Sequence, residues 1–308
     1  MSLLPSKLIV FFLTYFVYSS ASVSQFIRFS LYTAEHADIA LTLRLGAYTH
    51  ELYRLDRSTQ LFVIVHGWLQ SSNDLYVSYI RYLTFRSVKK NAIILTVDWT
   101  KLARNEYEVA KKYNSAVANI TTEVLTSFLG PRKIKFQNAH IICHCMGCHI
   151  AAMACKNIWR FSKKKIDRIT ALDPAGPGYY SKMSERLGPN DADVVFVVHT
   201  DAFRFGYGSK CGNIDFYPNG GKHPQPGCLN FSGIVDYNLC SHQRSIELYI
   251  ESLDDPVFYG IKCPRYRDYR KGLCSSNAKL NFAKKLRKEY QGTYFYMTNP
   301  YRPFLRKK

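Results

Sequence analysis

Five short runs of apolar residues recur along the chain, and each is bounded by polar or turn-forming residues. Runs of this length, rich in Ile, Val and Leu, are typical of strands that are buried on both faces. They are Leu61–Val65, Ala92–Val97, Ala139–Ile142, Ile166–Leu172 and Val194–His199. Continuous apolar strands of this kind favour a parallel sheet over an antiparallel sheet with one wet face.

Segments with helical spacing alternate with these runs. They are Asp74–Arg86, Glu106–Leu129, Met146–Trp159 and Ser241–Leu253. The alternation predicts the α/β class, with a mostly parallel central sheet covered by helices on both faces. Ligands of such sheets bind at the carboxyl ends of the strands, so residues that follow the strands are the first candidates for chemistry.

The amino terminus indicates the compartment. Lys7 is followed by the apolar run Leu8–Tyr18 and by small residues up to Ala21, a pattern typical of a secretory signal peptide over residues 1–21. A membrane anchor is the alternative, but the run is short for a membrane span. We therefore expect a secreted, extracellular protein, in which disulfides are the default use of cysteine. Asn119 and Asn230 are candidate glycosylation sites.

Composition and charge narrow the partners. The chain has 308 residues, 47% of them hydrophobic, so it can bury a full core. Its formal net charge is +19, which raises nucleic acid, anionic membrane and acidic glycan as partner classes. Secretion argues against nucleic acid. Residues 262–308 hold fourteen Lys and Arg against two acids. This basic C-terminal segment is either a solvated face or a contact for an anionic membrane surface or polyanion.

The strongest chemical signal lies where the run Ala139–Ile142 ends. The residues Cys143-His144-Cys145-Met146-Gly147 follow, and a helix begins at once. A strand, a sharp turn and a helix form the setting of a nucleophile elbow, whose usual pattern is G-x-S-x-G. Here Gly147 fits the last position, Cys143 replaces the first glycine, and Cys145 occupies the nucleophile position.

Partners for this nucleophile follow in the order that the elbow predicts, which is nucleophile, acid and base. Asp173 ends the run Ile166–Leu172 and His242 precedes the late helix. His66-Gly67-Trp68 ends an earlier strand, where a backbone N–H can face a reacting carbonyl. The N–H groups of Trp68 and Met146 are the candidate oxyanion hole.

With these motifs the chain resembles the pancreatic-lipase-like family of secreted hydrolases, and most closely its invertebrate phospholipase A1 branch. The residues that carry the resemblance cover nearly the whole mature chain: His66–Trp68, Val97–Trp99, His144, Gly147, His149, Leu172–Ala175, His199–Asp201, Asp215–Gly221, Gln225–Cys228, Cys240–Ser245 and Thr298–Pro300. The resemblance implies one α/β-hydrolase domain over residues 22–308, without the carboxy-terminal β-sandwich of vertebrate members. It also implies a lipid or phospholipid substrate and no metal or organic cofactor.

The family places a lid between two paired cysteines just before the catalytic His. Cys228 and Cys240 match those positions, which implies a disulfide and a lid at 228–240 with only 11 residues between the cysteines. A lid this short resembles phospholipase A1 members, because less cover leaves room for a bulky head group. Cys263 and Cys274 resemble a second family disulfide. Cys211 has no partner that the resemblance assigns.

The departure from the family at the elbow leaves two hypotheses open. Thiolates attack acyl carbons well, so the chain can be a thiol ester hydrolase of phospholipase A1 type. Alternatively, Cys143 crowds the strained turn and the chain is a lipase-like pseudoenzyme that binds lipid or a protein partner. A zinc cluster of Cys143, Cys145, Cys148, His144 and His149 is not expected, because a strand end and a first helical turn splay these side chains.

Overall fold

The computed structural model describes residues 23–43, 55–88, 91–131, 133–228, 239–254, 259–281 and 286–306. The signal peptide expected at 1–21, the candidate sequon Asn230 and most of the lid expected at 228–240 lie outside these described residues. No helix in the described ranges has the length and apolar character needed to cross a bilayer.

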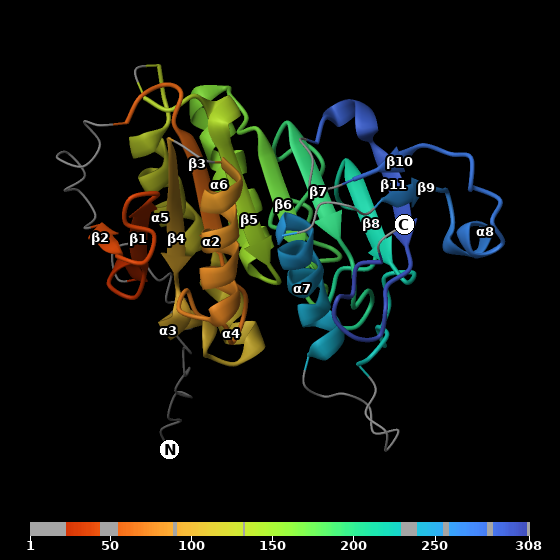
Figure 1. The fold of residues 1–308 in the computed structure, drawn as a ribbon. Helices are drawn as coiled ribbons and strands as arrows, with labels where there is room; N and C mark the ends of the chain where they lie inside the picture. Colours follow the sequence, from red (N-terminus) through yellow and green to blue (C-terminus); the bar gives the residue numbers. More distant parts are fainter. Residues whose placement is uncertain are drawn as a thin grey trace, which may run out of the picture.

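An 11-stranded sheet runs through the described part of the chain in the order β10-β9-β11-β8-β7-β6-β5-β3-β4-β1-β2 (Figure 1). Its strands are β1 (Arg28–Thr33), β2 (Leu41–Leu43), β3 (Gln60–Val65), β4 (Ala92–Asp98), β5 (Ala139–His144), β6 (Arg168–Leu172), β7 (Val194–Val198), β8 (Ile214–Pro218), β9 (Gly260–Lys262), β10 (Lys279–Leu280) and β11 (Gly292–Tyr296). The strands from β4 to β11 in this order are parallel, and β1, β2, β9 and β10 add antiparallel edges.

Helices cover both faces of this sheet (Figure 1). They are α2 (Leu75–Val88), α3 (Thr100–Ala103), α4 (Tyr107–Lys112), α5 (Asn114–Phe128), α6 (Gly147–Ser162), α7 (Cys240–Asp254) and α8 (Tyr266–Arg270), with short 3-10 turns η2 (Phe136–Asn138) and η3 (Lys288–Tyr290). Val63 and Val65 pack with residues of α5 and α6, whereas Ile64 packs with residues of α2 and α7. Because side chains alternate across a strand, one apolar run supplies both layers of the core.

The predicted fold class is confirmed, and each of the five predicted strands is present within a few residues of its expected bounds. The predicted helix Glu106–Leu129 is instead two helices, α4 and α5, that meet at Tyr113. The apolar pattern did not predict β1, β2 or the strands from β8 to β11. These strands are short or rich in polar and aromatic residues, so their strand character depends on pairing with neighbours rather than on an apolar run.

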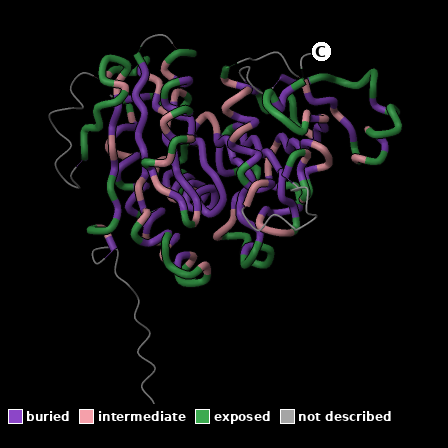
Figure 2. The backbone as a smooth tube through the Cα atoms, turned by 60° about the horizontal axis from the view of Figure 1, so that its bottom comes forward, coloured by how far each residue is buried: buried purple, intermediate pink, exposed green. Residues whose placement is uncertain are grey.

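The arrowheads of the parallel strands point down in Figure 1, so their carboxyl ends share one edge of the sheet. Figure 2 shows that the buried segments lie mostly in the middle of the molecule and that most exposed segments lie around them. We call the edge with the strand carboxyl ends the carboxyl edge and the opposite one the amino edge. The loops after β3, β5, β6 and β7 all leave from the carboxyl edge.

Two disulfides lie near the carboxy-terminal part of the sheet. Cys228 is bonded to Cys240 with a Cα–Cα distance of 5.6 Å, and Cys263 to Cys274 with one of 5.7 Å. Arg244 braces the first bond, since its guanidinium donates to the Pro226 carbonyl at 2.7 Å and contacts the Cys228 sulfur at 3.5 Å. This role explains a buried arginine at the start of α7 without a substrate contact.

Candidate active site

The turn between β5 and α6 has the conformation of a nucleophile elbow. Cys145 has a φ of 56°, a left-handed value that a side chain adopts only where its surroundings hold it there. Its N–H donates to the Leu172 carbonyl at 3.2 Å, and its own carbonyl accepts the N–H of Ala175 at 3.2 Å. Both bonds tie the turn to β6 and the residues that follow it, so the Cys145 side chain is lifted to the carboxyl edge.

Gly147 permits this turn. A Cβ atom on Gly147 would lie 2.5 Å from the Val65 carbonyl oxygen and would also collide with that of His66. Both are backbone atoms of β3 and its end, which cannot move aside without shifting the sheet. The final glycine of the elbow pattern is therefore required by the approach of α6 to β3.

Cys143 does not crowd the turn, contrary to the expectation from its sequence position. It lies inside β5, paired with Val65 and Ala171, and is fully buried. Its thiol points toward the Thr170 carbonyl at 3.6 Å and contacts Cys148. Cys143 occupies a regular strand position, and the positive φ occurs only at Cys145. The strand therefore accommodates a thiol at a position where the usual elbow pattern has glycine.

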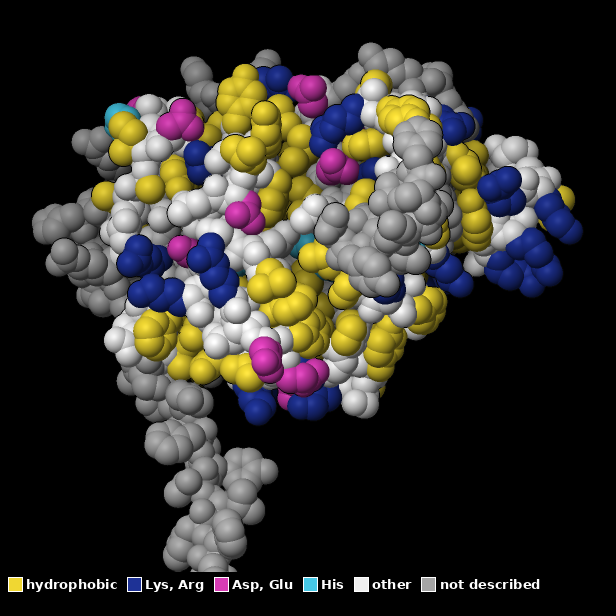
Figure 3. Space-filling model, turned by 90° about the horizontal axis from the view of Figure 1, so that it is seen from below, with side chains coloured by type: hydrophobic (Ala, Val, Ile, Leu, Met, Phe, Trp, Pro, Cys, Tyr) yellow, Lys and Arg dark blue, Asp and Glu magenta, His cyan; other side chains and the backbone are white. Residues whose placement is uncertain are grey.

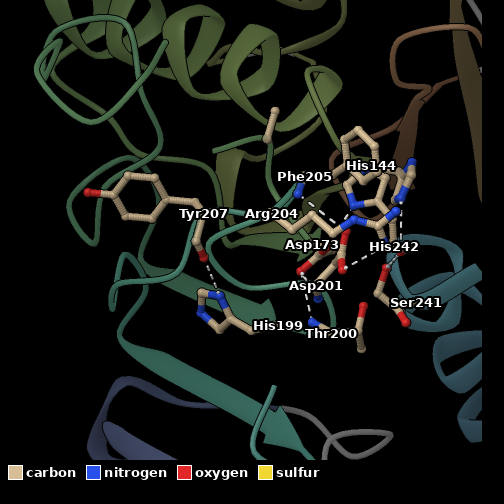
Figure 4. Close-up of polar contacts among 12 residues, drawn as sticks. His144, Asp173, His199, Thr200, Asp201, Arg204, Phe205, Tyr207, Ser241 and His242 are labelled. Carbon is tan, nitrogen blue, oxygen red and sulfur yellow. Dashed lines mark hydrogen bonds and ion pairs between the residues drawn. The ribbon is translucent and has the colours of Figure 1, made fainter. Parts of the chain in front are cut away.

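Asp173 and His242 form a buried acid–base pair (Figure 4). The Nδ1–H of His242 donates to Asp173 Oδ2 at 2.6 Å. The other carboxylate oxygen accepts the backbone N–H of Thr200 at 2.8 Å and that of Asp201 at 3.2 Å. These hydrogen bonds fix the orientation of the Asp173 carboxylate. The carboxylate in turn selects the His242 tautomer that is protonated at Nδ1, so Nε2 is available.

Gly206 closes over the Asp173 carboxylate. A Cβ on Gly206 would lie 2.5 Å from both carboxylate oxygens, so no other residue fits there. The 201–207 loop is fixed by His199, whose Nδ1 donates to the Tyr207 carbonyl at 2.9 Å while Nε2 lies 2.9 Å from Asp215 Oδ1. This second buried pair supports the loop that supplies the amides for Asp173.

The charge on His242 depends on Cys145. Burial alone would lower the pKa of His242, but an ionised Cys145 and the hydrogen bond to Asp173 outweigh it and raise that pKa to about 10. The buried Nε2 atom has no hydrogen bond of good geometry to any described residue. It is the nitrogen that can exchange a proton with the neighbouring thiol.

Asp201 is a third buried carboxyl group beside this pair. Burial and the charge of Asp173 raise the pKa of Asp201 to about 6. Its Oδ2 accepts the N–H of Phe205 at 3.2 Å, and Arg204 and His223 lie 3.8 and 3.7 Å from Oδ1. Near neutral pH it therefore adds negative charge behind the imidazole.

The two N–H groups expected to hold an oxyanion are available. Among the described residues, the backbone N–H groups of Trp68 and Met146 donate no hydrogen bond. Met146 caps the amino end of α6, where the helix dipole favours negative charge. The 67–68 turn lies against Cys145, because a Cβ on Gly67 would lie 2.5 Å from the Cys145 Cβ.

Gln70 organises the same corner and was not predicted from the sequence. Its Oε1 accepts the Gly67 N–H at 2.8 Å, lies 2.8 Å from His144 Nδ1 and is within 3.2 Å of the Tyr76 hydroxyl. A buried glutamine three residues after a strand-ending glycine is the only signal that the sequence carries. The contacts with His144 and Tyr76 arise only when β3, α2 and β5 come together.

The five elbow residues considered as a zinc cluster have other contacts. His144 lies against Gln70 and 3.3 Å from the His242 carbonyl, and His149 bonds Ala175 and Leu187. Burial raises the pKa of the Cys148 thiol well above its usual value. Cys211 is also a buried free thiol.

A small cavity of about 60 Å³ opens at Cys145 and His242. Its lining, among the described residues, is mostly apolar and comes from several carboxyl-edge loops: Trp68, Leu69, Gln70, Tyr107, His144, Cys145, Phe205, Leu239, His242 and Gln243. Cys145 and His242 thus share one opening, and Asp173 is fully buried against the Nδ1 side of the imidazole.

Comparisons with known proteins show which family the chain resembles. The family model described as Lipase matches residues 17–304. The lipoprotein lipase of Rattus norvegicus is 32% identical over 242 residues, which are 72% of this chain and 50% of that protein. The lipoprotein lipase of Homo sapiens is 31% identical over 242 residues, with the same shares of 72% and 50%. The chain spans about half the length of the curated relatives it matches.

Solved structures resemble parts of the chain. Est1E from Butyrivibrio proteoclasticus aligns with a TM-score of 0.29 and 12% identity, covering 38% of this chain and 42% of that one. Carboxyl esterase 2 from Tuber melanosporum aligns with a TM-score of 0.31 and 13% identity, covering 46% and 57%. At such scores the overlap is partial, and the sheet order and the elbow carry the fold assignment.

Proposed function

Because this chain belongs to the lipase family, we propose that it hydrolyses carboxylic esters of lipids outside the cell, with Cys145 as nucleophile. The preferred substrate in this proposal is a phospholipid cut at the sn-1 ester, a phospholipase A1-type reaction. The observation that carries the proposal is the 2.6 Å bond between His242 and Asp173 beside a cysteine held at a φ of 56°.

In the proposed mechanism the Cys145 thiolate attacks the acyl carbon, and the N–H groups of Trp68 and Met146 bind the oxyanion. The tetrahedral intermediate collapses as the His242 imidazolium gives its proton to the leaving alkoxide. This step leaves an acyl thioester on Cys145. Neutral His242 then takes a proton from water, which attacks the thioester and releases the fatty acid.

The proposal starts from a Cys145 thiolate beside the His242 imidazolium. The position at the amino end of α6 contributes a partial positive charge, and the hydrogen bond to Asp173 stabilises the protonated imidazole. Asp173 and Asp201 balance that positive charge in the buried site. A thiolate–imidazolium pair needs no further base to begin the reaction.

The choice of a lipid substrate is supported by the surface around the opening. Exposed apolar side chains gather on the face seen from below in Figure 3. Those on carboxyl-edge loops, which we call the apolar rim, are Phe26, Leu69, Val109, Tyr180, Met183 and Phe203. Apolar side chains at one end of a molecule are suited to an apolar surface such as lipid. The preference for phospholipid is supported by the 11 residues between Cys228 and Cys240.

The basic C-terminal segment is proposed as an additional contact with anionic membranes. Part of its charge is internally compensated, since Arg265 pairs with Asp268 at 2.8 Å and Arg302 with Glu247 at 2.8 Å. Salt-sensitive adsorption to anionic vesicles, with weaker adsorption to neutral vesicles, is the expected result. Equal, salt-independent binding to both would count against this contact.

A lipid-binding pseudoenzyme is the second candidate, and one observation favours it. The cavity at Cys145, about 60 Å³ among the described residues, is far below the roughly 300 Å³ at which most ligand pockets begin. In this alternative the elbow keeps its shape but no acyl group reaches the thiol.

Hydrolysis by the purified secreted protein separates the two candidates. Phospholipid vesicles are incubated with the wild type, with Cys145→Ala and with Cys155→Ala, a control that removes a buried thiol elsewhere on α6. Release of the sn-1 fatty acid by the wild type and the control, but not by Cys145→Ala, is the expected result. Activity that survives in Cys145→Ala would falsify the assigned nucleophile. A wild type that binds the vesicles but releases no fatty acid would favour the pseudoenzyme.

A further inference from the structure

A groove of about 650 Å³ lies at the amino edge, away from the elbow. It is formed by residues 129–131 and 135–137, which precede β5, by the end of α6 and by Arg57 just before β3. These segments precede strands, whereas the Cys145 site is built from segments that follow them. The groove and the candidate active site are therefore on opposite edges of the sheet (Figure 1).

The groove combines an apolar surface with cations. Its apolar lining includes Leu129, Pro131, Phe136 and Phe161. Phe161 is 80% exposed and lies in the last turn of α6, after the exposed residues Trp159 and Arg160. A large aromatic side chain left this open at the end of a helix indicates a surface that an apolar ligand can cover.

Three cations also line the groove: Arg57, Lys135 and Lys164. All three are exposed, and no described residue forms an ion pair with their side chains. No acidic side chain is found among the described residues that line the groove. The lining is thus complementary to a ligand with one negative group and an apolar body.

We propose that this amino-edge groove binds a single-chain anionic amphiphile of the fatty-acid class. The carboxylate would lie among Lys135, Lys164 and Arg57, with the chain on Phe136, Phe161 and Leu129. The volume is within the roughly 300–1,000 Å³ of ligand pockets. A sulfated glycan would use the cations but not the aromatic surface, and so is less well matched. The site is distinct from the ester-hydrolysing site and does not depend on its activity.

Calorimetric titration of the Cys145→Ala protein with dodecanoate, below its micellar concentration, tests the groove without turnover. One strong site is expected, with binding at least tenfold weaker for 1-dodecanol and none for dodecyltrimethylammonium. Shortening the acid by one methylene should weaken binding by roughly fourfold, since each buried CH₂ contributes that factor. Equal binding of the alcohol and the acid would overturn the role of the cations.

Surface variants locate the site. In the same Cys145→Ala background, Lys164→Glu and Phe161→Ala should each weaken dodecanoate binding at least tenfold. Phe203→Ala is the matched control and should leave dodecanoate binding unchanged, since Phe203 is an exposed aromatic on the apolar rim. Loss in the Phe203 variant but not in the Phe161 variant would place the ligand at the carboxyl edge and overturn the proposal.

A polyanion arm completes the test. The fatty-acid proposal fails if heparin binds, if Lys164→Glu weakens heparin binding, and if Phe161→Ala changes the binding of neither heparin nor dodecanoate. The groove would then be a polyanion-binding surface. Thermal melting of each variant checks folding, and none of these exposed positions contributes to the core. Because hydrolysis is absent throughout, a negative result here leaves the proposed ester hydrolysis untouched.

Discussion

The two edges of the sheet differ in how their polar groups are held. At the carboxyl edge Asp173, Cys145 and His242 are almost completely buried, and hydrogen bonds fix the orientation of the carboxylate and the imidazole. At the amino edge Arg57, Lys135 and Lys164 extend into solvent around an open groove. Buried, fixed groups suit a reaction that develops charge at one point, whereas exposed side chains suit binding that tolerates variation in the ligand. The predictions below exploit this contrast.

The largest expected effect is on catalysis at Asp173. In Asp173→Asn, the Thr200 and Asp201 amides can still be satisfied, but the new NH₂ faces His242 Nδ1 and imposes the wrong tautomer. We expect kcat/KM for ester hydrolysis to fall on the order of 10³- to 10⁴-fold. The matched control is Asp191→Asn, a buried aspartate at the amino edge that pairs with Lys156 at 2.8 Å. A similar loss in both variants would show that the effect is general destabilisation.

Gly147 should show the next largest effect. In Gly147→Ala the added Cβ meets the Val65 and His66 carbonyl oxygens, so we expect a loss of about 3 kcal/mol in unfolding free energy. Gly188→Ala is the control at the amino edge, where the nearest atom to an added Cβ is 3.9 Å away. Urea denaturation measures both. Equal stability of the two variants would contradict the close approach of α6 to β3.

The pH dependence of hydrolysis tests the ion pair. Wild-type kcat/KM should fall as the pH rises through about 10, because His242 then loses the proton that it gives to the leaving group. In Cys145→Ser no thiolate raises the pKa of His242, and the hydroxyl needs the neutral imidazole as base. Its kcat/KM should therefore rise with pH through a lower pKa and not fall near 10. Rates are corrected with Cys145→Ala, and identical profiles for Cys and Ser would exclude a resting ion pair.

The smallest expected effect concerns Asp201. Its pKa is raised from 3.8 to about 6, so the folded chain holds the proton more tightly than the unfolded chain between those values. Stability contributed by this group is present at low pH and is lost as the pH rises through about 6. From pH 4 to 7 the stability of Asp201→Asn relative to wild type should rise by roughly 1–3 kcal/mol. Denaturant titrations at both pH values, with exposed Asp254→Asn as control, measure it; parallel curves for the two variants would contradict the shift.

Much of the fold could be predicted because its signals are local. The five apolar runs became β3 to β7, since a strand buried on both faces needs an unbroken apolar stretch. The edge strands could not be predicted in this way. β1 becomes a strand because Arg28–Thr33 pairs with Asp98–Ile93 of β4, and that partner lies about 65 residues away in the chain.

The candidate site also has features that the sequence predicts and features that only the tertiary structure reveals. Spacing within the chain predicted the elbow and the order of Cys145, Asp173 and His242, and the family resemblance implied the two disulfides. Only the tertiary structure decided that the amides of Thr200 and Asp201 orient Asp173, that Gly206 leaves room for it, and that Gln70 joins the 67–68 turn to His144. It also brought Arg57, Lys135 and Lys164 to one groove. The physical reason is the sequence separation of the interacting residues. Periodicity and turn chemistry depend on residues that are close in the sequence. These contacts form only where loops from separate strands leave the same edge of the sheet.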